Sequence, residues 1–261
     1  VDIRAEFSRS QVDFRTIAYF AQGLRDWHSV LRDASGTVSG PVAAMRGSIG
    51  EVTLRDTKLG LRFAIDGLPD VKRTRFVFDV TSLETNAADV EYILQDIART
   101  SLGEKLPMFE RAGRIGFSGR FDGLLSDFTA SGDLETDLGR AAVRFNVKPS
   151  EQAATAFEGS LETVDFETGR LLGSRKIGRV SLGADVTGVF GQTFGMQARA
   201  RIPKLEFNGY AYGDLALDGK FENRKFTGNI ASADPNIAFD FNGDLDFSDS
   251  LPAYHFDLHL R

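Results

Sequence analysis

Few residues of this 261-residue sequence combine a type and a spacing that could do chemistry. The first candidates are His255 and His259, which flank Asp257 in an alternating segment. Imidazole and carboxylate groups are common metal ligands, so the pattern could indicate a metal site. Positions i and i+4 of a strand, however, lie about 13 Å apart, too far for both imidazoles to bind one ion. We therefore favour a solvated strand face over a metal site.

An acidic run is the second candidate. Asp240, Asn242, Asp244 and Asp246 alternate with other residues, and oxygen ligands of this kind could bind calcium. A calcium-binding loop needs glycine at its sixth position, which this run lacks, and alternation is typical of a strand. We again favour a solvated face.

A basic cluster is the third candidate. Lys72, Arg73 and Arg75 could contact anionic lipid headgroups. An ordinary exposed loop explains the same three residues, and we favour it.

Motifs for catalysis and for nucleotide binding do not occur. The string Gly116-Phe117-Ser118-Gly119 has the wrong spacing for a nucleophile elbow, and its glycines do not match a phosphate-binding loop. The absence of cysteine removes disulfides, zinc–thiolate sites and thiol nucleophiles. The sequence therefore predicts a protein that is not an enzyme and has no cofactor, with a hydrolase of unrecognised type as an alternative.

Composition narrows the class of protein. The chain is 42% hydrophobic and 26% charged, with a net charge of −6, which excludes disorder and makes nucleic acid a poor partner. The sequence contains no run of about 18 apolar residues, so it predicts no transmembrane helix. Phenylalanine occurs 22 times against five tyrosines and one tryptophan. Such a preference for rings without a polar group indicates a wide, dry apolar surface.

Alternation with period two dominates the sequence and predicts strands with one dry and one wet face. It is clearest in residues 59–66, 237–247 and 254–261. Turn residues at short intervals favour an antiparallel meander. Glycines inside the strands indicate bends or bulges, so we expect the sheet to curl progressively. These interior glycines are Gly119, Gly132, Gly159, Gly219 and Gly243.

The predicted fold class is therefore mainly β, a long curled antiparallel meander, either a rolled sheet or an open solenoid-like one. Two short amphipathic helices interrupt it, one after Asp13 and one after Asn86, and a third helical turn follows Asp165. We expect a β-sheet region with two helices over residues 1–110 and a repetitive meander over 111–261, continuous with the first part. Strand patterns at both ends of the sequence indicate a piece of a longer chain with open sheet edges.

Several segments in a fixed order also resemble a known family. The early ones are Val12-Asp13-Phe14 and Ile65-Asp66-Gly67-Leu68-Pro69-Asp70. The later ones are 127–136, 169–173, 177–182, 205–210, 226–228, 234–236, 241–243 and 246–252. Together they are similar to the translocation-and-assembly-module TamB family of the AsmA-like superfamily, in its Bacteroidetes form.

The resemblance implies an internal segment of a large protein that is anchored in the inner membrane of a Gram-negative bacterium and spans the periplasm. Its strands would form a β-taco with an apolar groove that carries phospholipid between the two membranes in envelope biogenesis. The family also assists outer-membrane protein assembly, with a barrel partner bound through other parts of the full-length chain. No catalytic residue or cofactor follows from the resemblance.

We expect acyl chains of phospholipid to contact the apolar side chains of the strands. The candidate groove residues are Phe117, Phe121, Phe128, Phe145, Phe207, Leu217, Phe221, Ile237, Phe239, Phe241, Phe247, Phe256 and Leu258. Periodicity does not separate an open trough from a closed sandwich core, since both need one dry face per strand.

Two further interpretations stay open. The protein could be a structural, chaperone-like scaffold whose strand edges pair with client strands. An outer-membrane barrel is disfavoured because its aromatic girdles use tryptophan and tyrosine, which are scarce here.

Overall fold

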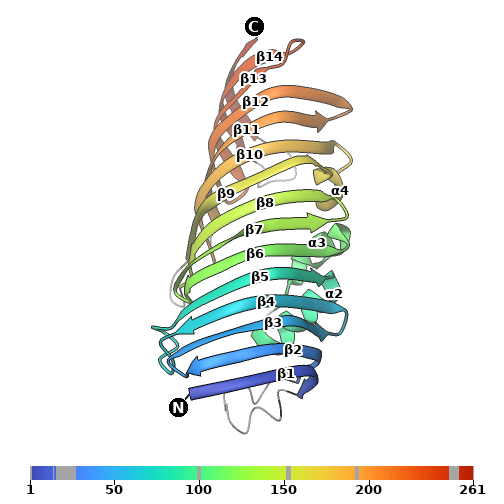
Figure 1. Ribbon diagram of the computed structural model, residues 1–261. Helices are drawn as coiled ribbons and strands as arrows, with labels where there is room; N and C mark the ends of the chain where they lie inside the picture. Colours follow the sequence, from blue (N-terminus) through green and yellow to red (C-terminus); the bar gives the residue numbers. More distant parts are fainter. Residues whose placement is uncertain are drawn as a thin grey trace. The chain divides into compact units, whose positions relative to one another are not determined.

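The computed structural model describes residues 2–13, 15, 28–98, 101–150, 154–191, 194–246 and 253–260. In this part of the chain, fifteen strands form one antiparallel sheet in which each strand pairs with the next along the chain (Figure 1). The sheet is open, because β1 (Asp2–Asp13) and β15 (Ala253–Leu260) are its two edges. The predicted mainly β antiparallel meander is confirmed.

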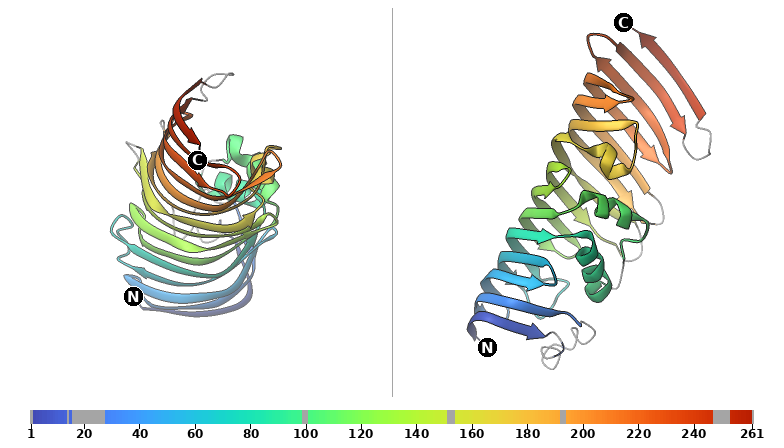
Figure 2. Two further views of the ribbon diagram at one scale, coloured as in Figure 1. Left: turned by 90° about the horizontal axis from the view of Figure 1, so that it is seen from above. Right: turned by 90° about the vertical axis from the view of Figure 1, so that its right-hand side faces the viewer.

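Where the structure describes the connection, a short turn or a helical segment joins consecutive strands (Figure 2). The strands between the two edges are β2 (Val30–Pro41), β3 (Ala44–Leu54), β4 (Thr57–Asp66), β5 (Arg75–Thr85), β6 (Ile115–Leu124), β7 (Asp127–Thr136), β8 (Gly139–Lys148), β9 (Thr155–Phe166), β10 (Ile177–Phe190), β11 (Phe194–Phe207), β12 (Tyr210–Glu222), β13 (Lys225–Ala233) and β14 (Ala238–Asp246).

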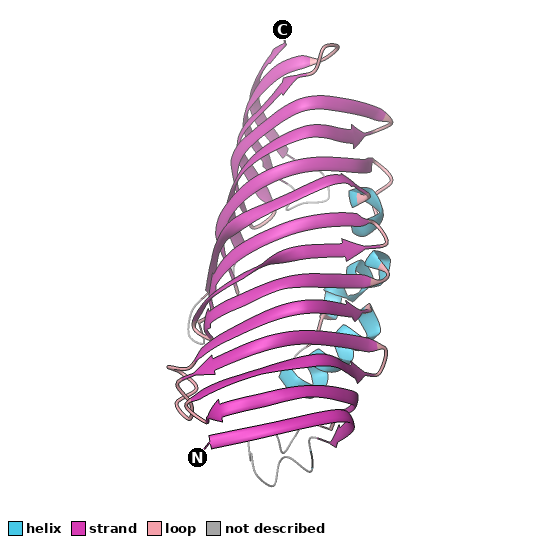
Figure 3. Cartoon of the chain, viewed as in Figure 1, coloured by secondary structure: helices cyan, strands magenta, loops and turns pink. Residues whose placement is uncertain are grey.

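Among the described residues, the labelled helices lie in two of the connections (Figure 3). Between β5 and β6 are α2 (Ala87–Ile93), the π-helix η2 (Leu94–Ala98), the 3₁₀-helix η3 (Gly103–Lys105) and α3 (Leu106–Ala112). Between β9 and β10 is α4 (Thr168–Leu172). No helix in the described ranges is long and apolar enough to cross a membrane.

Two of the three predicted helical segments are confirmed. Asn86 caps α2, where its side chain accepts a hydrogen bond from the Asp89 N–H at 3.0 Å, and α4 follows Asp165 as expected. The helix expected after Asp13 falls on residues 16–27, outside the described residues. Helix α3 was not predicted, although Pro107 in its first turn and Gly113 at its end, with a φ of +72°, are ordinary boundary signals.

A buried carboxylate anchors α2 to the turn between β3 and β4. Asp89 accepts hydrogen bonds from the Asp56 N–H at 2.9 Å and from the Thr57 hydroxyl at 3.0 Å. The Arg55 guanidinium forms an ion pair with it at 2.9 Å and lies over the Tyr92 ring. This network places the helix beside the ends of the strands.

The chain divides into two compact units. Unit 1 comprises Val1–Leu125 and Gly132–Asp137, and unit 2 comprises Ser126–Ser131 and Leu138–Arg261. Within each unit the sheet is neither closed nor strongly curled, so the rolled form expected from the sequence is not confirmed.

The environment of the glycines inside the strands explains why the expected strong curl is not observed. Gly159, Gly219 and Gly243 pair across neighbouring strands without a shift of register, so the bulges expected there were a wrong prediction. A phenylalanine ring instead occupies the space where a side chain would begin. The pairs are Phe145 with Gly159, Phe157 with Gly188 and Phe226 with Gly219 in unit 2, and Phe63 with Gly47 and Phe117 with Gly132 in unit 1. At Gly243 the same space is taken by the His255 carbonyl oxygen and by Cα and Cβ of Phe256.

One register shift lies beside Gly119 of β6 and another at Gly50 of β3, and further shifts lie at charged residues. Register shifts include Arg9 in β1, Asp33 in β2 and Asp165 in β9, whose φ angles are 43°, 56° and 48°. A non-glycine residue in the left-handed region together with a register shift indicates a β-bulge, which bends a strand locally. Three of the bulges therefore lie at charged residues that the alternation pattern did not reveal.

Replacing a ring-covered glycine tests this packing. In Gly159→Ala the new Cβ would overlap the Arg144 carbonyl oxygen and would lie 2.7 Å from Phe145 Cδ1 and 2.8 Å from Phe145 Cα. Because ring and backbone must shift, we expect the free energy of unfolding in urea to fall by about 1–3 kcal/mol.

The matched control is Gly183→Ala on the neighbouring strand, where the nearest atom, Glu162 Cγ, is 3.9 Å away. Its effect should stay within about 0.5 kcal/mol. Equal effects of the two substitutions would show that the ring does not need the glycine.

Candidate apolar binding face

Side chains that share one face of unit 2 can be identified from the register, since directly opposed residues on neighbouring strands point to the same side. Two ladders of such residues run from β8 to β15, and we call this side the apolar face of unit 2. One ladder is Val143, Leu161, Ala184, Ala200, Leu217, Ile230, Phe241 and Leu258. The other is Val147, Phe157, Gly188, Met196, Phe221, Phe226, Leu245 and Tyr254.

The opposite side of the same strands is polar. The ladder between the two apolar ones, on the other face, is Arg144, Ser160, Asp185, Arg199, Asp218, Asn229, Asn242 and Asp257. Unit 2 therefore carries a sharp division between a dry and a wet face across eight consecutive strands.

Unit 1 has an apolar face of its own, built by the same rule. A ladder crosses all six of its strands from β1 to β6. It consists of Ala5, Val38, Gly47, Phe63, Phe78 and Phe121. The rings of Phe78 and Phe121 lie 5.8 Å apart.

Most of the sequence-predicted groove residues lie on these faces. Phe117 and Phe121 lie on the apolar face of unit 1. The structure brings seven together on the apolar face of unit 2, namely Phe145, Leu217, Phe221, Phe239, Phe241, Phe256 and Leu258.

The remaining predicted residues lie elsewhere. Phe207 is at the end of β11, and Ile237 precedes β14 in a turn; both are exposed. Phe128 is half-buried on β7, and Phe247 lies outside the described residues. None of these four is shown to join the apolar ladders described above.

Sequence reasoning missed several rings of the same faces. Phe157, Phe190, Phe194 and Phe226 lie on the apolar face of unit 2. The available signal was an aromatic residue two positions from a glycine, as in Phe157 and Gly159. Such a signal becomes specific only when the pairing of strands is known.

Part of the apolar face of unit 2 remains accessible. Phe190 is 49% exposed at one end of β10, and Phe256 is 50% exposed on the edge strand. All eight residues of β15 are exposed. The described part of unit 2 holds one sheet and the five-residue helix α4, so no second layer of this unit covers the face.

Ion pairs cross the polar face of unit 1. Arg120 contacts Asp79 at 2.7 Å and Asp122 at 3.1 Å, and Arg75 contacts Asp122 at 2.7 Å. Partial burial opposes ionisation of Asp122, but its hydrogen bonds from Arg75 and Arg120 outweigh this and lower its pKa. These pairs favour the observed register and keep this face wet.

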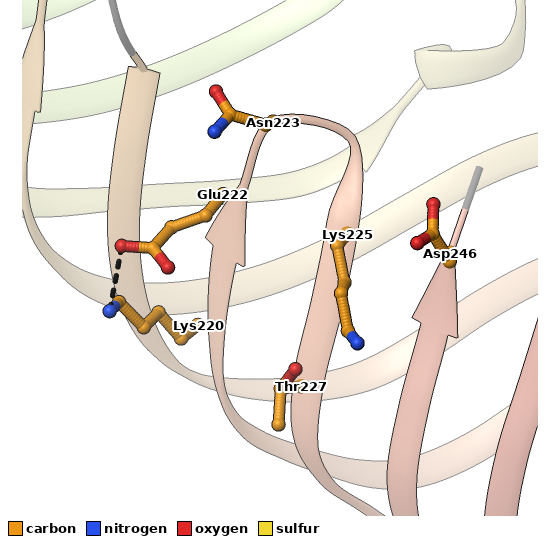
Figure 4. A pocket seen from close by; sticks show the side chains of 6 residues that line it. All are labelled: Lys220, Glu222, Asn223, Lys225, Thr227 and Asp246. Carbon is orange, nitrogen blue, oxygen red and sulfur yellow. Dashed lines mark ion pairs between the residues drawn. The ribbon is translucent and has the colours of Figure 1, made fainter. Parts of the chain in front are cut away.

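A hollow of about 280 Å³ lies on the polar face of unit 2 (Figure 4). Lys220 pairs with Glu222 at 2.7 Å within it, and Lys225 pairs with Asp244 at 3.1 Å. These charges neutralise one another, so the hollow offers little attraction to a charged ligand.

The candidate metal residues lie on the polar face as well. His255 and His259 are on β15, opposite Asp244 and Asp240 of β14. Among the described residues, no group of three or more histidine, aspartate or glutamate side chains could hold a metal ion.

A carboxylate fixes the turn that leads into β14. Asp234 accepts hydrogen bonds from the N–H groups of Asn236 at 2.8 Å and Gly213 at 2.9 Å, and from the Tyr210 hydroxyl at 2.8 Å. These bonds, with that from the Asn236 N–H foremost, hold the pKa of Asp234 below its usual value.

Comparison with known proteins gives no further assignment: no family model, no curated protein and no solved structure matches this chain. The resemblance to the TamB family therefore enters the functional argument as a proposal.

The bonds to Asp234 predict an acid-sensitive contribution to stability. Its lowered pKa means that the contribution is fully present above the ordinary aspartate pKa of about 3.9 and is lost as the pH falls through the folded-state value. Asp234→Asn should be less stable than the parent at pH 7, and the difference should shrink below about pH 4.

Urea unfolding between pH 2.5 and pH 7 measures this difference. Asp185→Asn, an exposed carboxylate of β10, is the control and should show little difference at any pH. A constant difference between parent and Asp234→Asn down to pH 2.5 would contradict the role of the charge.

Proposed function

We propose that this chain binds the acyl chains of phospholipid along its apolar faces. In this proposal it is a periplasmic segment of a TamB-like, inner-membrane-anchored protein that moves phospholipid between inner and outer membranes. Local bends would let the sheet fold around a lipid tail as a half-open trough, the β-taco form that the resemblance implies.

The single observation that supports this most strongly is the unbroken apolar ladder from Val143 on β8 to Leu258 on β15. An enzyme site or a metal site needs converging polar groups, whereas the two ladders of this face are hydrocarbon apart from the sulfur of Met196 and the hydroxyl of Tyr254. A lipid tail needs a continuous surface of that kind, and each buried methylene group contributes about 0.8 kcal/mol.

Phenylalanine and glycine fit this role physically. The rings supply area without donors or acceptors that would need partners inside the site. Because apolar attraction has no direction, a tail would keep similar contacts as it moves from one ladder to the next. The surface would therefore favour sliding over binding at one fixed position.

A second candidate function rests on the edge strand. β15 pairs only with β14 in the strand order, and all its residues are exposed. Such an edge can add a strand from another protein, as a scaffold for outer-membrane protein assembly would. Binding of this kind would slow amide exchange along β15, whereas a tail on the apolar face would leave the edge amides free.

Labelling of single cysteines tests lipid binding directly, because the natural chain contains none. Phe256→Cys and Asp257→Cys are neighbours on β15, both exposed, and point to opposite faces. After loading with dioleoylphosphatidylcholine, modification of Phe256→Cys by a maleimide should slow several-fold, because the tail covers that face.

The Asp257→Cys variant is the matched control and should react at the same rate with and without lipid. Unchanged rates at both positions in a lipid-loaded sample would overturn the proposed site. Slow modification of Phe256→Cys before any lipid is added would show instead that protein already covers the face.

A further inference from the structure

A second hollow in unit 2 has a different character from the apolar face. It has a volume of about 450 Å³ and lies between α4 and the beginning of β10. Its lining includes three arginines, one serine and two glutamates: Arg170, Arg175, Arg179, Ser174, Glu167 and Glu206. The chain folds locally around it because Gly173, with a φ of +68°, ends α4 and reverses the backbone.

Both carboxylates of the hollow are already engaged. Glu167 pairs with Arg170 at 2.5 Å and with Arg179 at 3.1 Å. Glu206 accepts a hydrogen bond from the Arg179 N–H at 3.0 Å and pairs with Lys204 at 3.0 Å. Those hydrogen bonds lower the pKa of each glutamate, so both stay ionised. Glu167 holds the guanidinium groups of Arg170 and Arg179 in place, and Glu206 holds the Arg179 backbone and Lys204.

Two cations of the same loop are not engaged. Among the described residues, the exposed side chains of Arg175 and Lys176 have no hydrogen-bond or ion-pair partner. Arg170, Arg179 and Lys204 bring the number of cations around the hollow to five. The anions are three, namely Glu167, Glu206 and Asp165. A local excess of positive charge in a chain of net charge −6 favours an anion rather than a metal ion here.

Exposed apolar side chains border this loop. Leu172 precedes the turn and is 52% exposed, and Phe207 is 36% exposed. Ile177, which lines the hollow, is opposite Phe207 in the register of β10 and β11. A cationic hollow therefore adjoins apolar surface at the ends of these strands.

We propose that this hollow binds the phosphate of an anionic amphiphile. Arg175 contacts the phosphate oxygens, the guanidinium group of Arg179, oriented by Glu167, adds a further donor, and Lys176, next to the lining in the same loop, adds positive charge. Arginine suits this task because its planar group donates two parallel hydrogen bonds to phosphate. The tail leaves the hollow past Phe207. This inference rests on the proposed lipid-binding function and adds a headgroup preference to it.

The test compares two lipids with the same tails. Dioctanoyl-phosphatidylglycerol has a net negative head and dioctanoyl-phosphatidylcholine a neutral one. In titration calorimetry at fixed ionic strength, the natural chain should bind the anionic lipid about tenfold more tightly, because the choline cation of the neutral lipid is repelled by Arg175 and Lys176 although its phosphate is the same. The double variant Arg175→Gln/Lys176→Gln should bind the two lipids equally.

A second double variant separates the site from general charge. Arg144→Gln/Arg224→Gln removes the same two positive charges from exposed positions of unit 2 outside the hollow. It should keep the preference for the anionic lipid. Loss of the preference in both double variants would overturn the assignment of this hollow.

The remaining outcomes are distinct. Tight and equal binding of both lipids by the natural chain would contradict the headgroup site and leave the lipid-binding function standing. Failure to bind either lipid would contradict that function and this inference with it. Inorganic phosphate that binds as tightly as the anionic lipid would show a free-phosphate site and overturn the amphiphile as ligand.

Discussion

Exclusion of water from one face of a one-layer sheet is the constraint on which this structure depends. Each strand of unit 2 presents hydrocarbon on one side and charge on the other, and the pairing keeps these sides aligned from β8 to β15. A slip by one residue would exchange the two faces of a strand. The apolar face therefore determines the register, and through it the positions of the charges opposite.

Pairs of phenylalanine and glycine show how the strands meet this constraint internally. The ring lies across the neighbouring strand, and the glycine leaves room for it, as Phe145 does over Gly159. Each ring thereby hides part of its own surface and part of the backbone beside it. Rings near the sheet margins, such as Phe190 and Phe256, remain about half exposed. The rings thus shield the centre of the apolar face from water. Another hydrophobic molecule would bury the most apolar surface at the margin, where rings are still exposed.

Alternation predicted the class of the fold because its cause is local: successive side chains of a strand point to opposite faces. Two helices were predictable for a similar reason, since Asn86 and the Asp165 segment mark their starts within a few residues. The function of the interior glycines was not predictable, because it depends on which ring of another strand lies opposite. For the same reason Phe157 and Phe226 were missed, although seven predicted residues share their face.

The cationic hollow was beyond sequence reasoning for another reason. Arg170, Arg175 and Arg179 look like scattered surface charges in the sequence, and only the reversal of the backbone at Gly173 brings them to one place. The ion pairs of Glu167 then decide which cations remain available. Which charged residues pair with one another depends on the folded chain and cannot be deduced from the composition.

Native mass spectrometry of the protein, purified without detergent and followed by organic extraction, tests the central claim most directly. If the apolar faces bind acyl chains, phospholipid should accompany the protein at a reproducible molar ratio and return after removal and incubation with vesicles. A mass equal to that of the bare chain, unchanged after incubation with vesicles, would contradict lipid binding. Pairing of the β15 edge with other strands would then become the leading explanation of the fold.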